Sequence, residues 1–307
     1  MRKLLIITAL LLPLHVSGQT DAQMSQHMFN RTTYNPASTG ASRYINIYGH
    51  WRDQWQGFGT DAPETMLLTA HTYFPQLKSG LGIVELSDRI GYERNIVFKL
   101  SYAYHVHLNS SSYLSLGLSA GALNRYIDWT QAVPEEYSDS FIIPSVAENK
   151  WTPDFDFGIE YNMERFTVGL SVTHINKTSD NAVYYNMGHH FYGYVKYKFG
   201  LGVDFDLVPA LFAQNSKKST HIEANLILFY RNVAWAGMSY RVDDRFNSES
   251  AVGTVGIDLM GFLRLGYSFD YNVGLIGKYA NNTHEIMLGI KLQKPQRLYA
   301  KTPRFFE

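Results

Sequence analysis

The sequence predicts an all-β fold, a transmembrane antiparallel β-barrel of about 14 strands preceded by an N-terminal plug-like segment. Three observations support this prediction. Apolar residues recur at every second position, long and short connections alternate along the chain, and aromatic residues make up 15% of the sequence. Strands of such barrels have one apolar and one polar face, and their aromatic side chains gather at both membrane interfaces.

The chain opens with a predicted signal peptide, residues 1–18. Two basic residues precede an apolar run from Leu4 to Leu12, and the small residues Val16-Ser17-Gly18 suit a cleavage site. The apolar run is too short for a membrane anchor. The sequence has no cysteine, which excludes lipid attachment, disulfides and thiolate metal sites. Its 27 basic and 27 acidic residues cancel, so it lacks the basic character of a nucleic-acid binder.

Period-two alternation is clear in SYLSLGLSAGAL (112–123), DFDFGIEY (154–161) and FLRLGYSFDY (262–271). Side chains point to opposite faces in turn along a strand, so each segment has an apolar face and a polar or small face. The expected strands are 43–51, 65–74, 79–90, 94–108, 112–126, 153–162, 165–176, 188–199, 203–212, 219–230, 233–242, 250–259, 261–271 and 281–291.

The connections between these strands fall into two classes. Even-numbered connections are short, and odd-numbered ones are longer apart from 91–93. Outer-membrane barrels have short periplasmic turns and longer outer loops, so we expect both termini in the periplasm. The alternative is a large soluble β-sandwich, which also alternates but needs no such segregation of loop lengths. The long connections are 52–64, 127–152, 177–187, 213–218, 243–249 and 272–280.

The polar strand faces are expected to line the lumen, since a cation facing lipid at mid-bilayer costs about 2–4 kcal/mol. A barrel of this size leaves space that side chains alone do not fill. Residues 19–42 are therefore predicted to tuck into the periplasmic mouth as a plug, the alternative being an irregular N-terminal arm. The expected plug residues are Met28, Phe29, Tyr34, Asn35, Pro36 and Gly40. The expected lumen charges are Lys99, Asp154, Asp156, Glu160, Lys196, Lys198, Asp204, Asp206, Glu223, Arg264, Asp270, Glu285 and Lys291.

Several longer motifs connect this chain to a known family. They include AQMSQHMFN (22–30), YNPASTG (34–40), HWRDQWQGF (50–58) and HEIMLG (284–289). With these motifs the chain resembles the PorP/SprF family of Bacteroidetes outer-membrane proteins, associated with the type IX secretion system and gliding motility. The family often has Asn-Pro where this chain has Asn30-Arg31, whereas its Arg-x-Gln-Trp motif is intact at residues 52–55.

The resemblance implies a non-enzymatic outer-membrane barrel, residues 43–291, of the fatty-acid-transporter type. Many relatives stop near the end of the last strand, whereas this chain continues with residues 292–307, which are expected to form a basic periplasmic tail. It also implies that the barrel docks or anchors a secreted adhesin or cargo, by the partner's C-terminal sorting domain, at the cell surface. Other type IX secretion components and outer-membrane lipid are the remaining expected partners, with no nucleic acid and no cofactor. The alternative is a channel for small or hydrophobic solutes.

Partner-binding residues are expected in two of the long loops, since exposed Trp, Arg and aromatic groups are typical of binding surfaces. Alternatively, Arg52 and Trp55 fold inward and brace the loop base, and the aromatics of the longest loop pack together as a lid. The predicted binding residues are Arg52, Gln54, Trp55, Phe58, Trp129, Tyr137, Phe141 and Trp151.

No catalytic set or metal site is expected. His189 and His190 are adjacent on a strand and point to opposite faces, so the pair is not suited to share one ion. His105 and His107 do share a face, but no carboxylate is assigned beside them, and a rim position explains them. No Gly-x-Ser-x-Gly nucleophile motif occurs.

Overall fold

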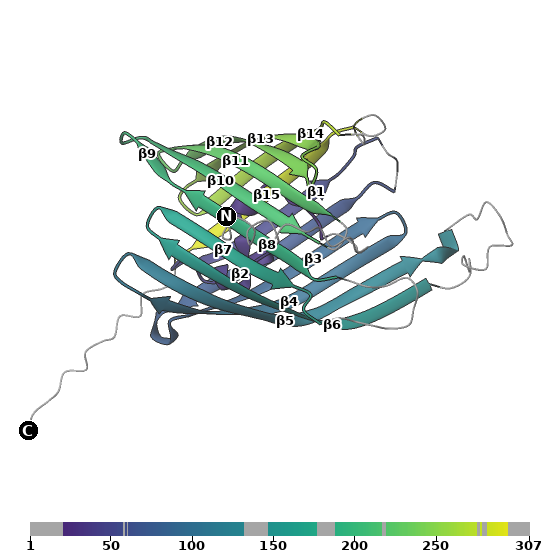
Figure 1. Ribbon diagram of the computed structural model, residues 1–307, viewed down its shortest axis with the longest axis horizontal. Coiled ribbons are helices and arrows are strands. Elements are labelled where there is room, and N and C mark those ends of the chain that lie inside the picture. Colours follow the sequence, from purple (N-terminus) through teal and green to yellow (C-terminus); the bar gives the residue numbers. More distant parts are fainter. Residues whose placement is uncertain are drawn as a thin grey trace, which may run out of the picture.

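The computed structural model describes residues 21–57, 59, 61–131, 147–176, 188–216, 219–274, 277 and 281–293. These residues form a closed antiparallel β-barrel in which every strand pairs with its neighbour in sequence (Figure 1). The barrel closes where β1 pairs with β15. Within the described residues, no helix is long and apolar enough to cross a membrane.

The strands follow the chain in simple order. They are β1 (Ile45–Asp53), β2 (Glu64–Phe74), β3 (Ser79–Ile90), β4 (Glu93–His107), β5 (Ser112–Asp128), β6 (Ala147–Met163), β7 (Phe166–Thr173), β8 (His190–Tyr197), β9 (Phe199–Leu201), β10 (Phe205–Asn215), β11 (Thr220–Tyr230), β12 (Ala234–Asp243), β13 (Ser248–Leu259), β14 (Leu263–Asn272) and β15 (Thr283–Leu292). Short 3₁₀ helices are η1 (His27–Phe29), η2 (Arg31–Thr33), η3 (Pro36–Ser38), η4 (Pro75–Leu77) and η5 (Trp129–Gln131).

The prediction of 14 antiparallel strands is confirmed. The extra label, β9, has three residues and lies beyond β8 after a one-residue break at Lys198, and both pieces pair with β10. The loop predicted at 127–152 is shorter than expected, because β5 and β6 stay paired as far as Asp128 and Ala147. Polar residues at the tip of this hairpin interrupt the alternation, although the backbone pairing continues.

Two ends of the barrel are distinguished by their connections. One end is called the long-loop end, and the opposite end is called the turn end. The long-loop end has the connections 54–63, 129–146, 174–189, 216–219, 244–247 and 273–282. In Figure 1 the β5–β6 hairpin projects furthest at the long-loop end.

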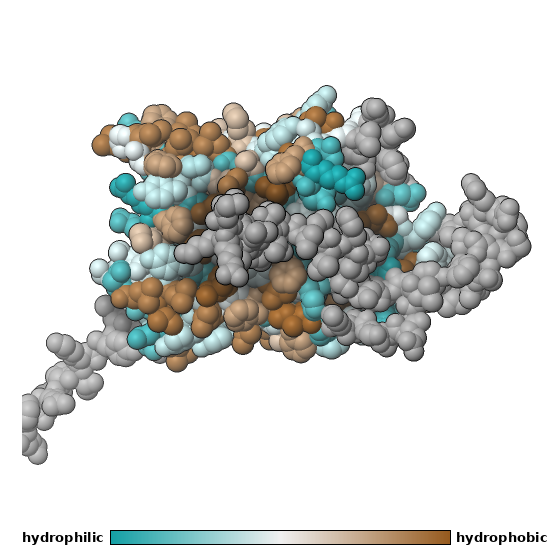
Figure 2. Space-filling model, in the orientation of Figure 1, coloured by the Kyte–Doolittle hydropathy of each residue, from teal (hydrophilic) through white to brown (hydrophobic). Residues whose placement is uncertain are grey.

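The outer surface of the barrel is apolar along most strands. Leu116 and Leu118 are 41% and 59% exposed on β5, whereas the intervening Ser115 and Ser119 are buried. Brown apolar side chains cover much of the upper and lower strands in Figure 2. Outward aromatic residues occur near both strand ends, as in a membrane barrel. Examples are Tyr102, Tyr104, Tyr197, Phe199, Phe205 and Tyr230 at the turn end, and Trp51, Tyr92, Trp151, Tyr240 and Tyr271 at the long-loop end.

The lumen contains most of the charges predicted for it. Buried charged side chains are Lys99, Asp154, Asp156, Glu160, Glu223, Asp270 and Glu285. Lys198 and Lys291, by contrast, are exposed. Both lie next to the turn end, where a side chain that starts on the inner face can reach water.

Candidate functional site

Residues 21–42, here called the N-terminal segment, lie against the inner faces of the strands along the length of the barrel. At the long-loop end, Asp21 accepts a 2.5 Å hydrogen bond from the Tyr192 hydroxyl. At the turn end, the Gly40 backbone N–H donates to His71 Nδ1 at 3.1 Å. We expected this segment only at the turn-end mouth. It reaches the other end because polar groups inside the lumen bind its first residues, a pairing that sequence alternation does not reveal.

Two buried carboxylates hold the first turn of the N-terminal segment. Glu285 accepts hydrogen bonds from the backbone N–H groups of Ser25 and Gln26, at 2.6 and 3.0 Å. The Ser25 hydroxyl donates to Asp270 at 2.7 Å. Arg52 bridges both carboxylates, at 2.8 Å to Asp270 and 3.2 Å to Glu285. Each carboxylate is therefore paired with a charge and also bonded to the segment.

A second buried ion pair lies beside this one. Arg241 contacts Glu223 at 2.6 Å and donates to the Gln23 side-chain oxygen at 3.1 Å. His27 of η1 lies 3.4 Å from the other Glu223 oxygen, and its ring stacks on Phe212 with centroids 4.1 Å apart. Buried charges are tolerated when they are paired and hydrogen-bonded, as these are.

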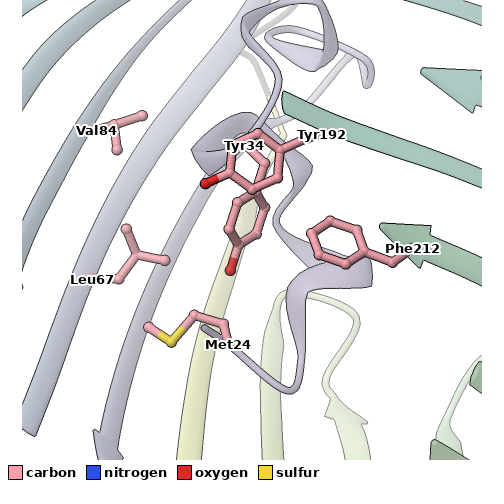
Figure 3. Packing of buried hydrophobic residues seen from close by; sticks show 6 residues of the cluster. All are labelled: Met24, Tyr34, Leu67, Val84, Tyr192 and Phe212. Carbon is pink, nitrogen blue, oxygen red and sulfur yellow. The ribbon is translucent and has the colours of Figure 1, made fainter. Parts of the chain in front are cut away.

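An apolar cluster surrounds the middle of the segment. Tyr34 packs against Tyr192 and Phe212, with ring centroids 5.2 and 5.4 Å apart. Figure 3 shows the two segment residues, Met24 and Tyr34, between side chains from opposite walls of the barrel. Burial raises the pKa of Tyr34, so its hydroxyl stays protonated. The full cluster is Met24, Tyr34, Leu67, Val84, Tyr192 and Phe212.

Arg31 of η2 makes the next charged contact. Its guanidinium lies 2.9 Å from Glu160, which also accepts hydrogen bonds from Asn162 and the Tyr194 hydroxyl. Burial lowers the pKa of Arg31, but the Glu160 carboxylate outweighs it, and the net shift is upward. Arg31 therefore stays charged inside the lumen. This residue stands where the family resemblance led us to expect proline.

The turn-end part of the segment packs by close backbone contact. Asn35 caps η3 by accepting a 2.9 Å hydrogen bond from the Ala37 N–H, and its amide nitrogen donates to the Tyr194 hydroxyl at 3.0 Å. Asn and Asp are favoured caps because their short side chains reach the free N–H groups at a helix start. Pro36 follows at the first helical position, where no N–H bond is lost.

Glycines of three strands make this close packing feasible. A Cβ atom added to Gly117 would lie 2.1 Å from the Ala37 nitrogen, and one on Gly158 would lie 2.0 Å from the Asn35 side-chain oxygen. A Cβ on Gly80 would lie 2.0 Å from the Thr39 carbonyl oxygen. Real Cβ atoms do not approach other atoms so closely, so residues 35–39 fit only because these strand positions are glycine.

The residues predicted for a plug all lie in the segment and contact the barrel wall or each other. Phe29 packs against Trp235, with ring centroids 5.0 Å apart, and the Arg264 guanidinium lies 5.0 Å from the Phe29 ring centroid. Met28 packs against the same apolar group as Phe29, formed by Ile227, Trp235 and Met287. Gly40 has a φ of 75° and approaches Gly80, a conformation that favours glycine.

A cavity of 340 Å³ remains between the segment and the turn-end strands. Charged side chains dominate one part of its lining, including Arg31, Arg165, Lys196 and Lys198. Lys198 is paired with Asp206 at 2.7 Å. The lining also includes the acidic residues Glu164 and Asp206 and apolar side chains such as Met28, Phe29 and Phe229, so the space is mixed in character.

The predicted partner-binding residues occupy different environments. Arg52 is buried in β1 and bound to lumen carboxylates, so it is not part of the outer surface. Gln54 and Trp55 are partly buried at the loop base. Trp151 is 63% exposed on β6, and Trp129 lies in η5 at the hairpin tip. Phe58, Tyr137 and Phe141 lie outside the described residues, as do the predicted signal peptide and residues 294–307 of the tail.

The β5–β6 hairpin extends at the long-loop end beyond the part of β6 that pairs with β7. β6 pairs with β5 from Ala147 to Met163, whereas the β7 pairing covers only Phe157–Asn162. Among the described residues, no strand pairs with the β7-facing edge of β6 between Ala147 and Thr152. Such an edge presents backbone groups that can add a further strand.

Sequence reasoning did not identify one cluster at the long-loop end. His174 Nε2 lies 3.0 Å from Asp21, and its Nδ1 lies 2.9 Å from Asp154. His190 Nδ1 lies 3.8 Å from Asp21. Burial lowers the pKa of His174, but Asp21 and Asp154 raise it overall to about 9. His174 follows β7 with a φ of 56°, so it leaves the strand alternation and turns inward beside Thr173.

Solved structures support the barrel architecture. The toluene transporter TbuX of Ralstonia pickettii aligns over 85% of this chain and 93% of its own, with a TM-score of 0.55 and 8% identity. The monoaromatic hydrocarbon channel CymD aligns over 91% of this chain and 96% of its own, with a TM-score of 0.50 and 14% identity. The P. putida toluene transporter TodX aligns over 85% and 94%, with a TM-score of 0.50 and 7% identity. At these identities the likeness is one of fold.

Sequence comparison gives the family. No curated protein matches this sequence. A family model described as type IX secretion system membrane protein PorP/SprF matches residues 16–290, which is most of the chain and includes the N-terminal segment and all the strands but the last residues of β15. A membrane β-barrel of a secretion-system family implies an outer-membrane location. The chain therefore belongs to the PorP/SprF family of type IX secretion system membrane proteins.

Proposed function

We propose that this outer-membrane barrel has no catalytic activity and docks a secreted adhesin or cargo at the cell surface, as part of type IX secretion and gliding motility. The long-loop end faces outward and binds the C-terminal sorting domain of the partner. The chain after β15 enters the periplasm and is available to other components of the secretion system.

The observation that carries this proposal is the position of the N-terminal segment inside the barrel. Hydrogen bonds hold its first half at Glu285 and Glu223, and close packing holds its second half at Gly117 and Gly158. A lumen with so many specific contacts to its own chain is suited to a stable platform. In this proposal the segment acts as a plug over the whole length of the lumen.

The projecting hairpin supplies a docking surface of suitable chemistry. An extended partner strand adds to the β7-facing edge of β6 at Ala147–Thr152 and forms main-chain hydrogen bonds. Trp151 is exposed on this strand and provides an anchor of the kind that dominates many interfaces.

Cargo retention by whole cells tests the docking proposal. We expect that deletion of 132–146, or Trp151→Ala, releases the partner into the medium while the barrel still inserts. Trp51→Ala is the matched control, because Trp51 is also exposed near the long-loop end, at 38%, but lies on β1. Unchanged retention in both hairpin variants would refute docking at this surface.

The second candidate function is a channel for small or hydrophobic solutes. The fold likeness to hydrocarbon channels favours it. Conductance of the purified barrel in planar bilayers separates the two. A docking barrel is nearly silent, and steady conductance by the intact protein favours the channel.

A further inference from the structure

Three metal-ligating side chains from separate parts of the chain meet at the long-loop end of the lumen. Asp21 belongs to the N-terminal segment, His174 follows β7 and His190 begins β8. One ligand atom from each lies within 4.8 Å of the other two. His190 is fully buried and His174 is 5% exposed. The adjacent pair His189–His190 concealed this grouping in the sequence, because only His190 takes part.

The distances suit a small transition-metal ion. A tetrahedral ion with bonds of about 2.1 Å holds its ligand atoms about 3.4 Å apart. The His174 Nε2 and His190 Nδ1 atoms lie 3.0 and 3.8 Å from their nearest Asp21 oxygens. The two histidines lie nearest to different oxygens of Asp21, and movements of these side chains bring one ligand atom of each residue around one ion. Two imidazoles with one carboxylate are a common ligand set for zinc and for neighbouring divalent transition metals.

The surroundings of His174 add a second, independent observation. Its other ring nitrogen, Nδ1, lies 2.9 Å from an Asp154 oxygen. Metal-ligating histidines nearly always donate their second N–H to a carboxylate or carbonyl, which fixes the ring and raises its basicity. Asp154 is itself held by Lys99 at 2.9 Å. The Asp154–His174 pair thus directs Nε2 toward Asp21.

The local charge also favours a divalent cation. Asp21, Asp154 and Asp156 contribute three carboxylates around His174, and Lys99 lies 2.9 Å from both Asp154 and Asp156. The His174 backbone N–H donates to Asp156 at 3.2 Å. Once His174 gives up its extra proton to become a ligand, three negative charges and a single positive one leave two negative charges among these residues. One divalent ion balances them.

We propose that Asp21, His174 and His190 form a binding site for a divalent transition-metal ion of the zinc type. The ion replaces the proton shared between His174 Nε2 and Asp21. Because its ligands come from the N-terminal segment and from two neighbouring strand ends, it fixes the start of the segment to the barrel wall. Tyr192 donates to Asp21 Oδ2 and helps to orient the carboxylate.

Metal content of the mature protein tests this proposal. The protein is purified in detergent without a histidine tag, stripped with chelator, reloaded with Zn²⁺ and measured by mass spectrometry of the metal. We expect about one equivalent per barrel, and a visible spectrum typical of nitrogen and oxygen ligands when Co²⁺ replaces zinc. If the reloaded protein holds much less than one metal ion per barrel, the proposal is wrong, and His174 and Asp21 share only a proton.

Variants locate the ion. His174→Gln and His190→Gln each abolish the stoichiometric metal, and Asp154→Asn weakens zinc affinity by about 10–100-fold. His221→Gln is the matched control, since His221 also pairs with a carboxylate, Glu249, at the long-loop end, at 2.7 Å. Heat-modifiable migration in electrophoresis confirms that each variant is a folded barrel. Full metal content in folded His174→Gln and His190→Gln barrels would also overturn the proposal.

Discussion

The two halves of the N-terminal segment are held in the same lumen by different kinds of interaction. Near the long-loop end, Ser25 and Gln26 are bound by a buried carboxylate that is paired with Arg52. Near the turn end, Asn35 and Ala37 contact glycine positions of the wall at distances that exclude any side chain. Hydrogen bonds to buried carboxylates fix the first half, and steric fit fixes the second. The segment is therefore expected to detach from either end separately.

The absence of cysteine from the sequence makes this comparison measurable. A single cysteine at Met24 reports on the long-loop half, and one at Ala37 reports on the turn-end half. Both positions are buried, at 3% and 0% exposure. A membrane-impermeant maleimide labels each reporter only when that half leaves the lumen.

The largest effect is expected for Glu285→Ala. The substitution leaves Arg52 with one carboxylate fewer and removes the acceptor of two backbone N–H groups. Breaking a buried ion pair by removing one partner costs about 3–5 kcal/mol. We expect a matching fall in the free energy of unfolding in urea, with labelling at Met24→Cys rising more than at Ala37→Cys.

The control for this variant is Arg231→Ala. Arg231 pairs with Asp204 at 2.7 Å, but these side chains are 60% and 36% exposed. An exposed pair contributes at most about 1 kcal/mol. Equal losses in the two variants would contradict the importance given to burial.

A smaller effect with the opposite pattern is expected for Gly117→Val. The new side chain collides with the backbone of Pro36 and Ala37. Overpacking costs about 1–3 kcal/mol, which corresponds to a change of roughly 5- to 150-fold in the population of the detached state. Labelling at Ala37→Cys should rise by such a factor while Met24→Cys changes little. Gly253→Val serves as the control, because a Cβ at Gly253 meets no atom within 4 Å.

The smallest of the three effects is expected for Asn35→Ala. It removes the cap of η3 and the amide bond to Tyr194, and loss of such a cap costs about 1 kcal/mol. Labelling at Ala37→Cys should rise modestly. Asn109→Ala provides the comparison, since Asn109 accepts a similar bond from the Ser111 N–H in an exposed turn, at 2.9 Å. If both variants changed the labelling equally, the cap would have no specific role.

Much of the barrel was predictable because alternation is a local property. The strand predicted at 79–90 has the observed bounds, and the faces of β5 follow its leucines and serines. The main error arose where the side-chain pattern of a segment differs from its backbone pairing. The polar tip of the β5–β6 hairpin was predicted as loop, although its backbone stays paired.

The sequence by itself determined which face of each strand is apolar and where most of the chain turns. Only the tertiary structure decided that Ser25 meets Glu285, 260 positions away, and that Asp21 meets His174. The physical reason is closure of the barrel. Period-two alternation sets the face of each strand, but the wall positions that surround the lumen at one level depend on strand register and closure, which no local pattern contains.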